Sequence, residues 1–292
     1  FQHTARRLLE LGLGYLSLDR AGSTLSTGER QRVQLARAVR NRTTGVLYVL
    51  DEPSIGLHPA NIDGLLGVMR DLLADGNSVV MVDHDTRILA AADYLVEMGP
   101  EAGAGGGHVV ACGTPAELRT DDRSLIGRYL PVGEMPAPDP MSNVRPRCPK
   151  GQLFERGTIH LETNALHTVH ALSVDLPVNR LTAVTGVSGS GKTTLVLEEL
   201  IPALNSANAG ENLPASVRGI DPAGIVRAQL IDATPIGANV RSTVATYCGV
   251  LDDLRRAFAR TDTAKAAGLK AGAFSYNTGK LRCPTCDGTG QV

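Results

Sequence analysis

Residues 186–193 read Gly-Val-Ser-Gly-Ser-Gly-Lys-Thr, after an apolar run at 181–185 and before a helical pattern at 193–200. They fit the pattern G-x-x-x-x-G-K-[ST] at every fixed position, in the strand–turn–helix context that the pattern requires. In such a loop, successive backbone N–H groups face a phosphate, and the N-terminus of the following helix adds a partial positive charge. The sequence therefore predicts a purine nucleoside triphosphate site here. An ordinary glycine-rich turn is the alternative.

Residues 186–193, which we call the phosphate loop, have expected roles at their fixed positions. We expect the Lys192 ammonium to reach the β- and γ-phosphates and the Thr193 hydroxyl to hold Mg²⁺. The predicted ATP-binding residues of the loop and the helix start are Gly186, Ser188, Gly189, Ser190, Gly191, Lys192, Thr193 and Thr194.

The chain before the phosphate loop alternates strand and helix patterns. Apolar runs at 46–50 and 78–82 have the length of strands that are buried on both faces, and residues 62–74 have a helical period. Strand, helix and strand in this order predict an α/β fold with a doubly wound parallel sheet.

Residues 131–150 predict a linker, because five prolines fall between Pro131 and Pro146. The linker separates an expected first unit, 1–130, from an expected second unit, 151–292. Within the second unit, the Asn-, Ala-, Gly- and Pro-rich stretch 203–224 is predicted to be mostly loop.

Residues 25–31 read Leu-Ser-Thr-Gly-Glu-Arg-Gln and are similar to the signature motif of ABC ATPases. The resemblance implies that Ser26, Gly28 and Gln31 bind the γ-phosphate side of an ATP held by another subunit or domain. Thr27 departs from the family, which usually has glycine there, and its Cβ would narrow the phosphate approach. A capped helix start is the alternative interpretation.

Residues 46–53 resemble a Walker B strand, because an apolar run ends in Asp51-Glu52-Pro53. Asp51 is the candidate ligand for Mg²⁺ and its waters, and Glu52 is the candidate general base for the attacking water. Residues 54–57 resemble the D-loop of ABC ATPases. His84, which follows the second apolar run, matches the switch histidine that contacts the γ-phosphate; a solvated surface histidine is the alternative.

The order of these motifs predicts parts of two tandem P-loop ATPase units of ABC type. One such unit carries its phosphate loop first, whereas this chain has the signature, Walker B and histidine before the linker and the phosphate loop after it. We therefore expect Glu52 and His84 to act on a different nucleotide from the one that Lys192 holds. Thr193 and Asp51 then belong to separate Mg²⁺ sites. The chain is expected to be a fragment that hydrolyses ATP weakly by itself.

Cys283 and Cys286 form a Cys-x-x-Cys pair whose spacing lets both thiolates reach one tetrahedral Zn²⁺. They predict half a zinc site at the start of a zinc module, with the other ligands outside the chain. A redox pair and a chaperone-type Cys-x-x-Cys-x-Gly-x-Gly repeat are alternatives. Cys112, Cys148 and Cys248 lack partner spacing and are interpreted as buried or incidental thiols.

The composition excludes some classes of function. The chain has 29 Lys and Arg against 30 Asp and Glu, so net charge alone cannot bind it to nucleic acid. Aromatic residues are only 3% of the chain, which argues against broad base-stacking platforms. No apolar run has the length of a membrane span, and the cysteine usage fits a reducing compartment, so we expect no membrane partner and a cytoplasmic location.

Longer stretches resemble the UvrA family, the damage-recognition ATPases of bacterial nucleotide excision repair. The supporting segments are residues 25–32, 48–59, 92–115, 185–195, 235–237, 245–253 and the Phe-Ser-Tyr-Asn sequence at 274–277. The resemblance implies tandem ATPase units that use ATP, Mg²⁺ and Zn²⁺, a homodimer of the full-length protein, binding of damaged double-stranded DNA, and handover to UvrB.

One residue of the second unit departs from the family. Ala233 stands where UvrA proteins have the glutamine that senses Mg²⁺ and the γ-phosphate. This departure favours, as an alternative, a UvrA-like drug-resistance or DNA-binding ATPase, including a passive binder. The cytoplasmic ATPase of an ABC transporter is a further alternative, but it gives no reason for a zinc module.

Overall fold

The computed structural model describes residues 2–40, 43–131, 151–232 and 242–288. The chain divides into two compact units. We call Phe1–Asn41 together with Ala233–Val292 the helical unit, and Arg42–Asp232 the sheet unit. The predicted linker lies outside the described residues from position 132 to 150, as does Ala233.

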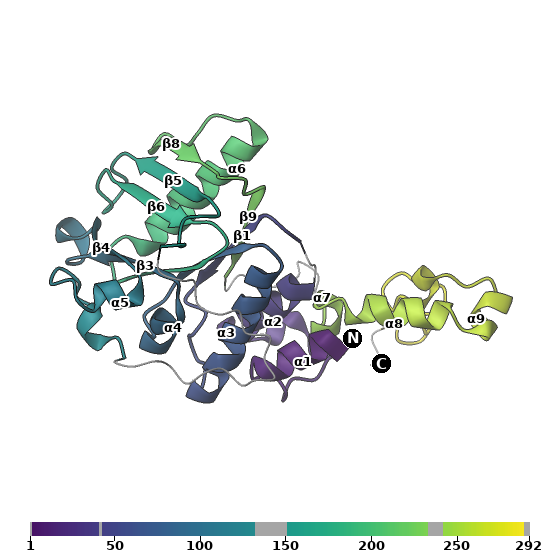
Figure 1. The fold of residues 1–292 in the computed structure, drawn as a ribbon. Coiled ribbons are helices and arrows are strands. Elements are labelled where there is room, and N and C mark those ends of the chain that lie inside the picture. The colour runs from purple at the N-terminus through teal and green to yellow at the C-terminus, as the bar shows by residue number, and fades with distance from the viewer. Residues whose placement is uncertain (1, 41–42, 132–150, 233–241, 289–292) are drawn as a thin grey trace. The chain divides into compact units, whose positions relative to one another are not determined.

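A six-stranded mixed sheet forms the centre of the sheet unit (Figure 1), with the strand order β4-β3-β7-β2-β1-β9. Five of its strands are parallel, and β4 is antiparallel to β3. The strands are β1 (Val46–Asp51), β2 (Ser78–Val82), β3 (Tyr94–Gly99), β4 (His108–Gly113), β7 (Leu181–Gly186) and β9 (Arg227–Ile231). The predicted α/β fold is thus confirmed. The apolar runs are strands because the sheet buries them on both faces.

Helices and a second sheet cover the central sheet. The second sheet is antiparallel, in the order β6-β5-β8, with β5 (Thr158–Thr163), β6 (Ser173–Pro177) and β8 (Val217–Asp221). After the phosphate loop come a π-helical segment η4 (Thr194–Leu200) and α6 (Ile201–Ala209), whose apolar side chains join both sheets in one core. The other helical segments of the unit are α3 (Pro59–Ala74), α4 (Thr86–Ala91), η2 (Gly103–Gly105), α5 (Pro115–Leu118) and η3 (Gly127–Tyr129).

The compact units do not follow the boundaries that the sequence predicted. Strand β7 comes from the expected second unit, yet it pairs with β2 on one side and β3 on the other, both from the expected first unit. Two parallel strands that are neighbours in sequence can accept a third strand between them. Their backbone groups form hydrogen bonds with the inserted strand as well as they would with each other. The division into parts of two tandem ATPase units of a longer protein stays a prediction.

The helical unit joins the two ends of the chain. Gly22 donates a backbone hydrogen bond to Ser242 (2.7 Å), and Ala21 forms an isolated antiparallel bridge with Thr243. Its helical segments are α1 (Gln2–Glu10), η1 (Gly22–Thr24), α2 (Thr27–Arg40), α7 (Val244–Tyr247), α8 (Val250–Ala259), α9 (Asp262–Ala266) and η5 (Ala271–Phe274). Over the part of the chain that the structure describes, no helix combines the length and apolar character needed to cross a membrane.

Candidate nucleotide-binding site

The carboxyl ends of the parallel strands bring several predicted site residues to one edge of the central sheet. Asp51 ends β1, Gly186 ends β7, and His84 lies two residues beyond β2. The strands β7, β2 and β1 are adjacent in that order. In open α/β sheets, ligands bind outside the carboxyl ends of the strands. This edge is therefore the candidate site.

The phosphate loop forms a cradle of backbone groups. Gly186 has a φ of +138°, and a Cβ there would lie 1.9 Å from the carbonyl oxygen of Met98, so only glycine fits. Gly189 and Gly191 also have positive φ, and their N–H groups make no hydrogen bond with the described residues. The helix begins directly after Gly191, which adds its partial positive charge to the cradle.

Lys192 closes over this cradle. Its Nζ donates to the carbonyl oxygens of Gly186 (3.0 Å) and Val187 (2.9 Å). Burial lowers the pKa of Lys192, and the carboxylates of Glu52 and Asp51 raise it in part. An ammonium that is half desolvated and held by carbonyl oxygens gains strongly when an anion replaces them, so this position suits a phosphate.

The charges of Asp51 and Glu52 act on Lys192 in this structure, and the charge of Lys192 acts on Asp51. Burial raises the pKa of Asp51, the charges of Glu52 and Asp232 raise it further, and Lys192 lowers it. Asp51 and Thr193 are predicted from the sequence to belong to separate Mg²⁺ sites. The structure instead places the Walker B end of β1 and the phosphate loop at the same sheet edge, because only β2 separates β1 from β7.

The hydroxyl groups of the loop differ in their surroundings. Thr193 is exposed and makes no hydrogen bond with its side chain among the described residues, whereas the Thr194 hydroxyl donates to Glu198 Oε1 (3.3 Å). Ser188 is exposed. Ser190 is fully buried, and its Oγ has no partner in the described part of the chain. The N–H groups of the loop and the Lys192 ammonium therefore fit a nucleotide phosphate. The Thr193 hydroxyl, which has no partner among the described residues, suits Mg²⁺.

A glycine-rich loop at 103–107, which was not predicted from the sequence to belong to the site, supports the phosphate loop through backbone hydrogen bonds. Gly103 donates to the carbonyl oxygen of Gly189 and Gly107 to that of Ser190, each at 3.2 Å. A Cβ on Gly107 would lie 1.6 Å from the carbonyl oxygen of Thr168. Four glycines within five residues were the only signal, since they let two backbones approach closely.

Glu52 and His84 lie on the loops that follow β1 and β2. Glu52 has a left-handed backbone (φ +48°), and its N–H donates to the carbonyl oxygen of Val82 (2.8 Å). The His84 side chain is exposed. Left-handed backbone at a non-glycine residue costs about 1 kcal/mol or more and is concentrated at functional sites.

The predicted signature residues lie in the helical unit, where Ser26 caps α2. The Ser26 Oγ accepts from the N–H of Glu29 (3.4 Å), and Glu29 Oε2 accepts from the N–H of Ser26 (2.6 Å). This reciprocal pair is a capping box. Gly28 is half-buried in the first turn and Gln31 is buried. The contact of these residues with an ATP stays a prediction.

The two cysteines of the predicted half zinc site are at least partly accessible. Cys283 is exposed and Cys286 is half-buried. Backbone hydrogen bonds from Cys286 and Thr285 lower the pKa of the Cys283 thiol. Such bonds favour a thiolate, which is the metal-binding form of cysteine. No group of three or more potential ligands occurs among the described residues, so the zinc site stays a prediction.

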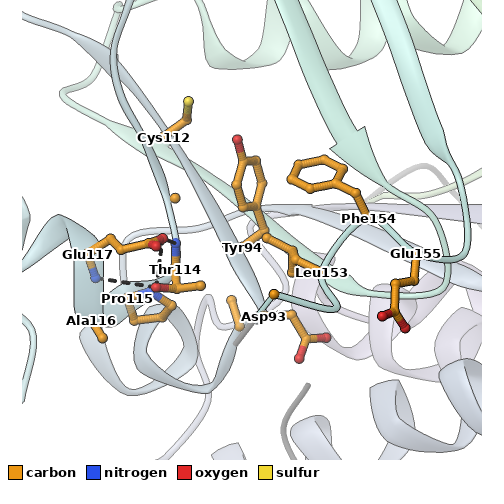
Figure 2. Close-up of a pocket in the computed structure, with 13 residues that line it drawn as sticks. Asp93, Tyr94, Cys112, Thr114, Pro115, Ala116, Glu117, Leu153, Phe154 and Glu155 are labelled. Atoms are coloured by element: carbon orange, nitrogen blue, oxygen red, sulfur yellow. Dashed lines mark hydrogen bonds between the residues drawn. The ribbon is translucent and has the colours of Figure 1, made fainter. Parts of the chain in front are cut away.

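A pocket of about 700 Å³ lies elsewhere in the sheet unit (Figure 2). It is at the start of β3, hence at the sheet edge opposite to the phosphate loop. Tyr94 and Phe154 pack edge to face in it, with ring centroids 5.5 Å apart. Two of its carboxylates are already engaged, Asp93 with the N–H of Leu181 and Glu117 in the capping box of α5. This pocket shows no catalytic arrangement.

Comparison with known proteins shows which proteins the chain is similar to. UvrABC system protein A of Bacillus subtilis (strain 168) is 42% identical over 287 residues, which cover 97% of the chain. The chain is homologous to a segment of UvrA. UvrABC system protein A of Treponema pallidum (strain Nichols) is also 42% identical, over 289 residues and 98% of the chain. The chain spans 29% of the length of both UvrA relatives.

The chain was also compared with solved structures and with protein-family models. The crystal structure of UvrA2 from Deinococcus radiodurans is 42% identical, with a TM-score of 0.42, covering 98% of the chain and 33% of the UvrA2 chain. No protein-family model matches the sequence.

Proposed function

We propose that the chain is the nucleotide-binding part of a UvrA-like ATPase that recognises DNA damage. The observation that carries this proposal is the position of Lys192 beside the N–H groups of Gly189 and Gly191, which make no hydrogen bond with the described residues. Lys192 is also within reach of the charges of Asp51 and Glu52. These are the groups that a triphosphate and its Mg²⁺ need together.

Each residue has a role in this proposal. The N–H groups of the phosphate loop and Lys192 bind the β- and γ-phosphates, and Thr193 and Asp51 orient Mg²⁺. When bound, ATP and Mg²⁺ supply the scissile phosphoanhydride and the charge that stabilises its cleavage. Glu52 takes a proton from the attacking water, and His84 contacts the γ-phosphate. Ser26 and Gly28 are proposed to cap an ATP across an interface between ATPase units.

The remaining features of the proposal come from the UvrA relatives. We propose damaged double-stranded DNA and a UvrB-like protein as partners, a homodimer for the full-length protein, and Zn²⁺ bound by Cys283 and Cys286 with ligands from outside the chain. Nucleotide state would control DNA binding by shifting the population of conformations.

Binding of MgATP by the chain tests the proposal directly. Isothermal titration should give a dissociation constant that Lys192→Ala weakens by about 10- to 100-fold, since a charged hydrogen-bonding group is worth about 1.5–3 kcal/mol. Lys280→Ala is the matched control, because Lys280 is exposed and makes no hydrogen bond or ion pair with the described residues. Equal affinity of wild type and Lys192→Ala would refute the assignment of the phosphate loop. Steady-state hydrolysis by this chain alone is expected to be weak.

A passive UvrA-like DNA-binding protein is the second candidate, favoured by alanine at position 233 in place of the family's glutamine. DNA affinity of the intact protein with and without ATP separates the two candidates. An ATP-dependent change supports the damage sensor, and equal affinity supports the passive binder. No salt-dependent DNA affinity in either state would contradict both.

A further inference from the structure

We propose that Asp83 is a positioning residue that ties the D-loop to the segment carrying His84. This inference rests on the proposed function, because both of its loops belong to the nucleotide site. Asp83 is not among the site residues predicted from the sequence. It lies directly after β2, between the buried strand and the predicted switch histidine.

The Asp83 carboxylate collects donors from both loops. It is buried, with 1% of the residue exposed. On one side, its Oδ1 accepts from the Ser54 hydroxyl (2.8 Å) and its Oδ2 from the Ser54 N–H (3.2 Å). On the other side, Oδ1 accepts from the N–H groups of His84 (2.7 Å) and Asp85 (2.9 Å). These four donors are its only side-chain partners in the described part of the chain, and none of them is a cation.

A buried carboxylate without a cation is costly unless several hydrogen bonds satisfy it. Removal of any of these donors therefore costs more at Asp83 than at an exposed aspartate. The two loops share one acceptor, so displacement of Ser54 lets the Asp83 carboxylate move and weakens its hydrogen bonds to the N–H groups of His84 and Asp85. The link consists of four part-buried hydrogen bonds to one buried carboxylate, which makes it stiffer than a link through exposed groups.

This link restricts the candidate general base as well. Glu52 lies two residues before Ser54, in a left-handed conformation, and its N–H is held by the carbonyl oxygen of Val82. Strained backbone of this kind persists only where the surroundings determine it. Anchoring of Ser54 by Asp83 supplies the second fixed point, on the C-terminal side of Glu52. Asp83 thus sets the positions of Glu52 and His84 together, from its position directly after β2.

The inference predicts a specific kinetic signature in the intact protein. Ser54→Ala removes one of the four bonds, and Asp83→Asn keeps the shape but loses the charge. Both variants should lower kcat for ATP hydrolysis by about tenfold or more while the dissociation constant for MgATP changes less than about threefold. The double variant should be no worse than Asp83→Asn alone, because both changes act through one link. Ser173→Ala and Asp122→Asn, both at exposed positions, are the controls.

Amide hydrogen exchange gives a readout that does not need hydrolysis. Ser54→Ala should speed exchange in residues 83–87 several-fold as well as in its own loop, and Asp83→Asn should speed both. A purely local role for Asp83 would confine the effect of Ser54→Ala to residues 52–57, and this result would overturn the inference, as would an unchanged kcat. Failure of the wild type to bind MgATP would instead count against the proposed function, with the exchange result still deciding the role of Asp83.

Discussion

Replacement of Asn179 by alanine tests the most unexpected feature of the fold, the insertion of β7 between β2 and β3. Asn179 lies two residues before β7 and is buried, with 4% of the residue exposed. Its Nδ2 donates to the carbonyl oxygens of Leu73 and Asn77, each at 2.8 Å, and its N–H donates to Ser78 Oγ (2.7 Å). One side chain therefore joins the start of β7 to the turn between α3 and β2.

The expected loss can be worked from these contacts. Asn179→Ala removes the Nδ2 donor from the carbonyl oxygens of Leu73 and Asn77, at about 1–2 kcal/mol each in net terms. The oxygen of Leu73 keeps one donor, the N–H of Gly76 (3.0 Å). Asn179 also has a φ of +55°, which asparagine tolerates and alanine does not, at about 1 kcal/mol. The free energy of unfolding should fall by about 3–5 kcal/mol. Asn179→Gly loses the same bonds but avoids the backbone strain, so it should be about 1 kcal/mol more stable than Asn179→Ala.

Urea unfolding followed by circular dichroism measures these differences, with the transition slope compared between variants. Asn208→Ala is the matched control, because Asn208 is exposed on α6 and should change stability by less than about 0.5 kcal/mol. An Asn179→Ala loss below about 1 kcal/mol, or one equal to that of the control, would refute the placement of β7 beside β2.

Three further substitutions give independent tests. Glu29→Ala removes the capping box of α2 and the acceptor of the Tyr15 hydroxyl (2.6 Å), so the free energy of unfolding should fall by about 1–3 kcal/mol in urea titrations. The pKa of the fully buried Glu199 is raised to about 7 by burial, from 4.5. Because its folded pKa exceeds its unfolded one, wild type should lose stability against Glu199→Gln as pH rises from about 4.5 to 7, by about 3 kcal/mol in total. Unfolding midpoints that run parallel with pH for both proteins would contradict this. Gly107→Ala should weaken MgATP binding at least tenfold in titrations with folding retained, since its Cβ would displace the support of the phosphate loop, whereas Gly67→Ala, with open space around it, should not.

The parts of the fold that sequence predicts well are those that local physics determines. The apolar runs at 46–50, 78–82 and 181–185 are strands, because only a parallel sheet buries such runs on both faces. The stretch 203–224 was wrongly expected to be mostly loop: it contains most of α6 and all of β8. The small and polar residues of this stretch are compatible with a helix end, an edge strand or a loop. Packing against the core determines which of these forms.

The site shows the same division. The phosphate loop is readable because its chemistry requires fixed residues at fixed spacing. The partner of each strand is not readable, since the insertion of β7 depends on contacts across a hundred residues, such as those of Asn179. Asp83 and Gly107 were not predicted as site residues, because their roles also depend on contacts between segments far apart in the sequence. Their importance comes from Ser54 and Thr168, to which no local pattern points.

The late arrival of β7 has a consequence for biosynthesis. Strand β3 ends at Gly99 and β7 at Gly186, so 87 residues (186 − 99) are translated between them. At about 5–20 residues per second, the facing edges of β2 and β3 wait about 4–17 seconds on the ribosome for the strand that fills the gap. Open edges of apolar strands attract other chains. Slower translation of residues 100–186 should therefore increase aggregation of the nascent chain, and a chaperone that shelters strand edges should increase the yield.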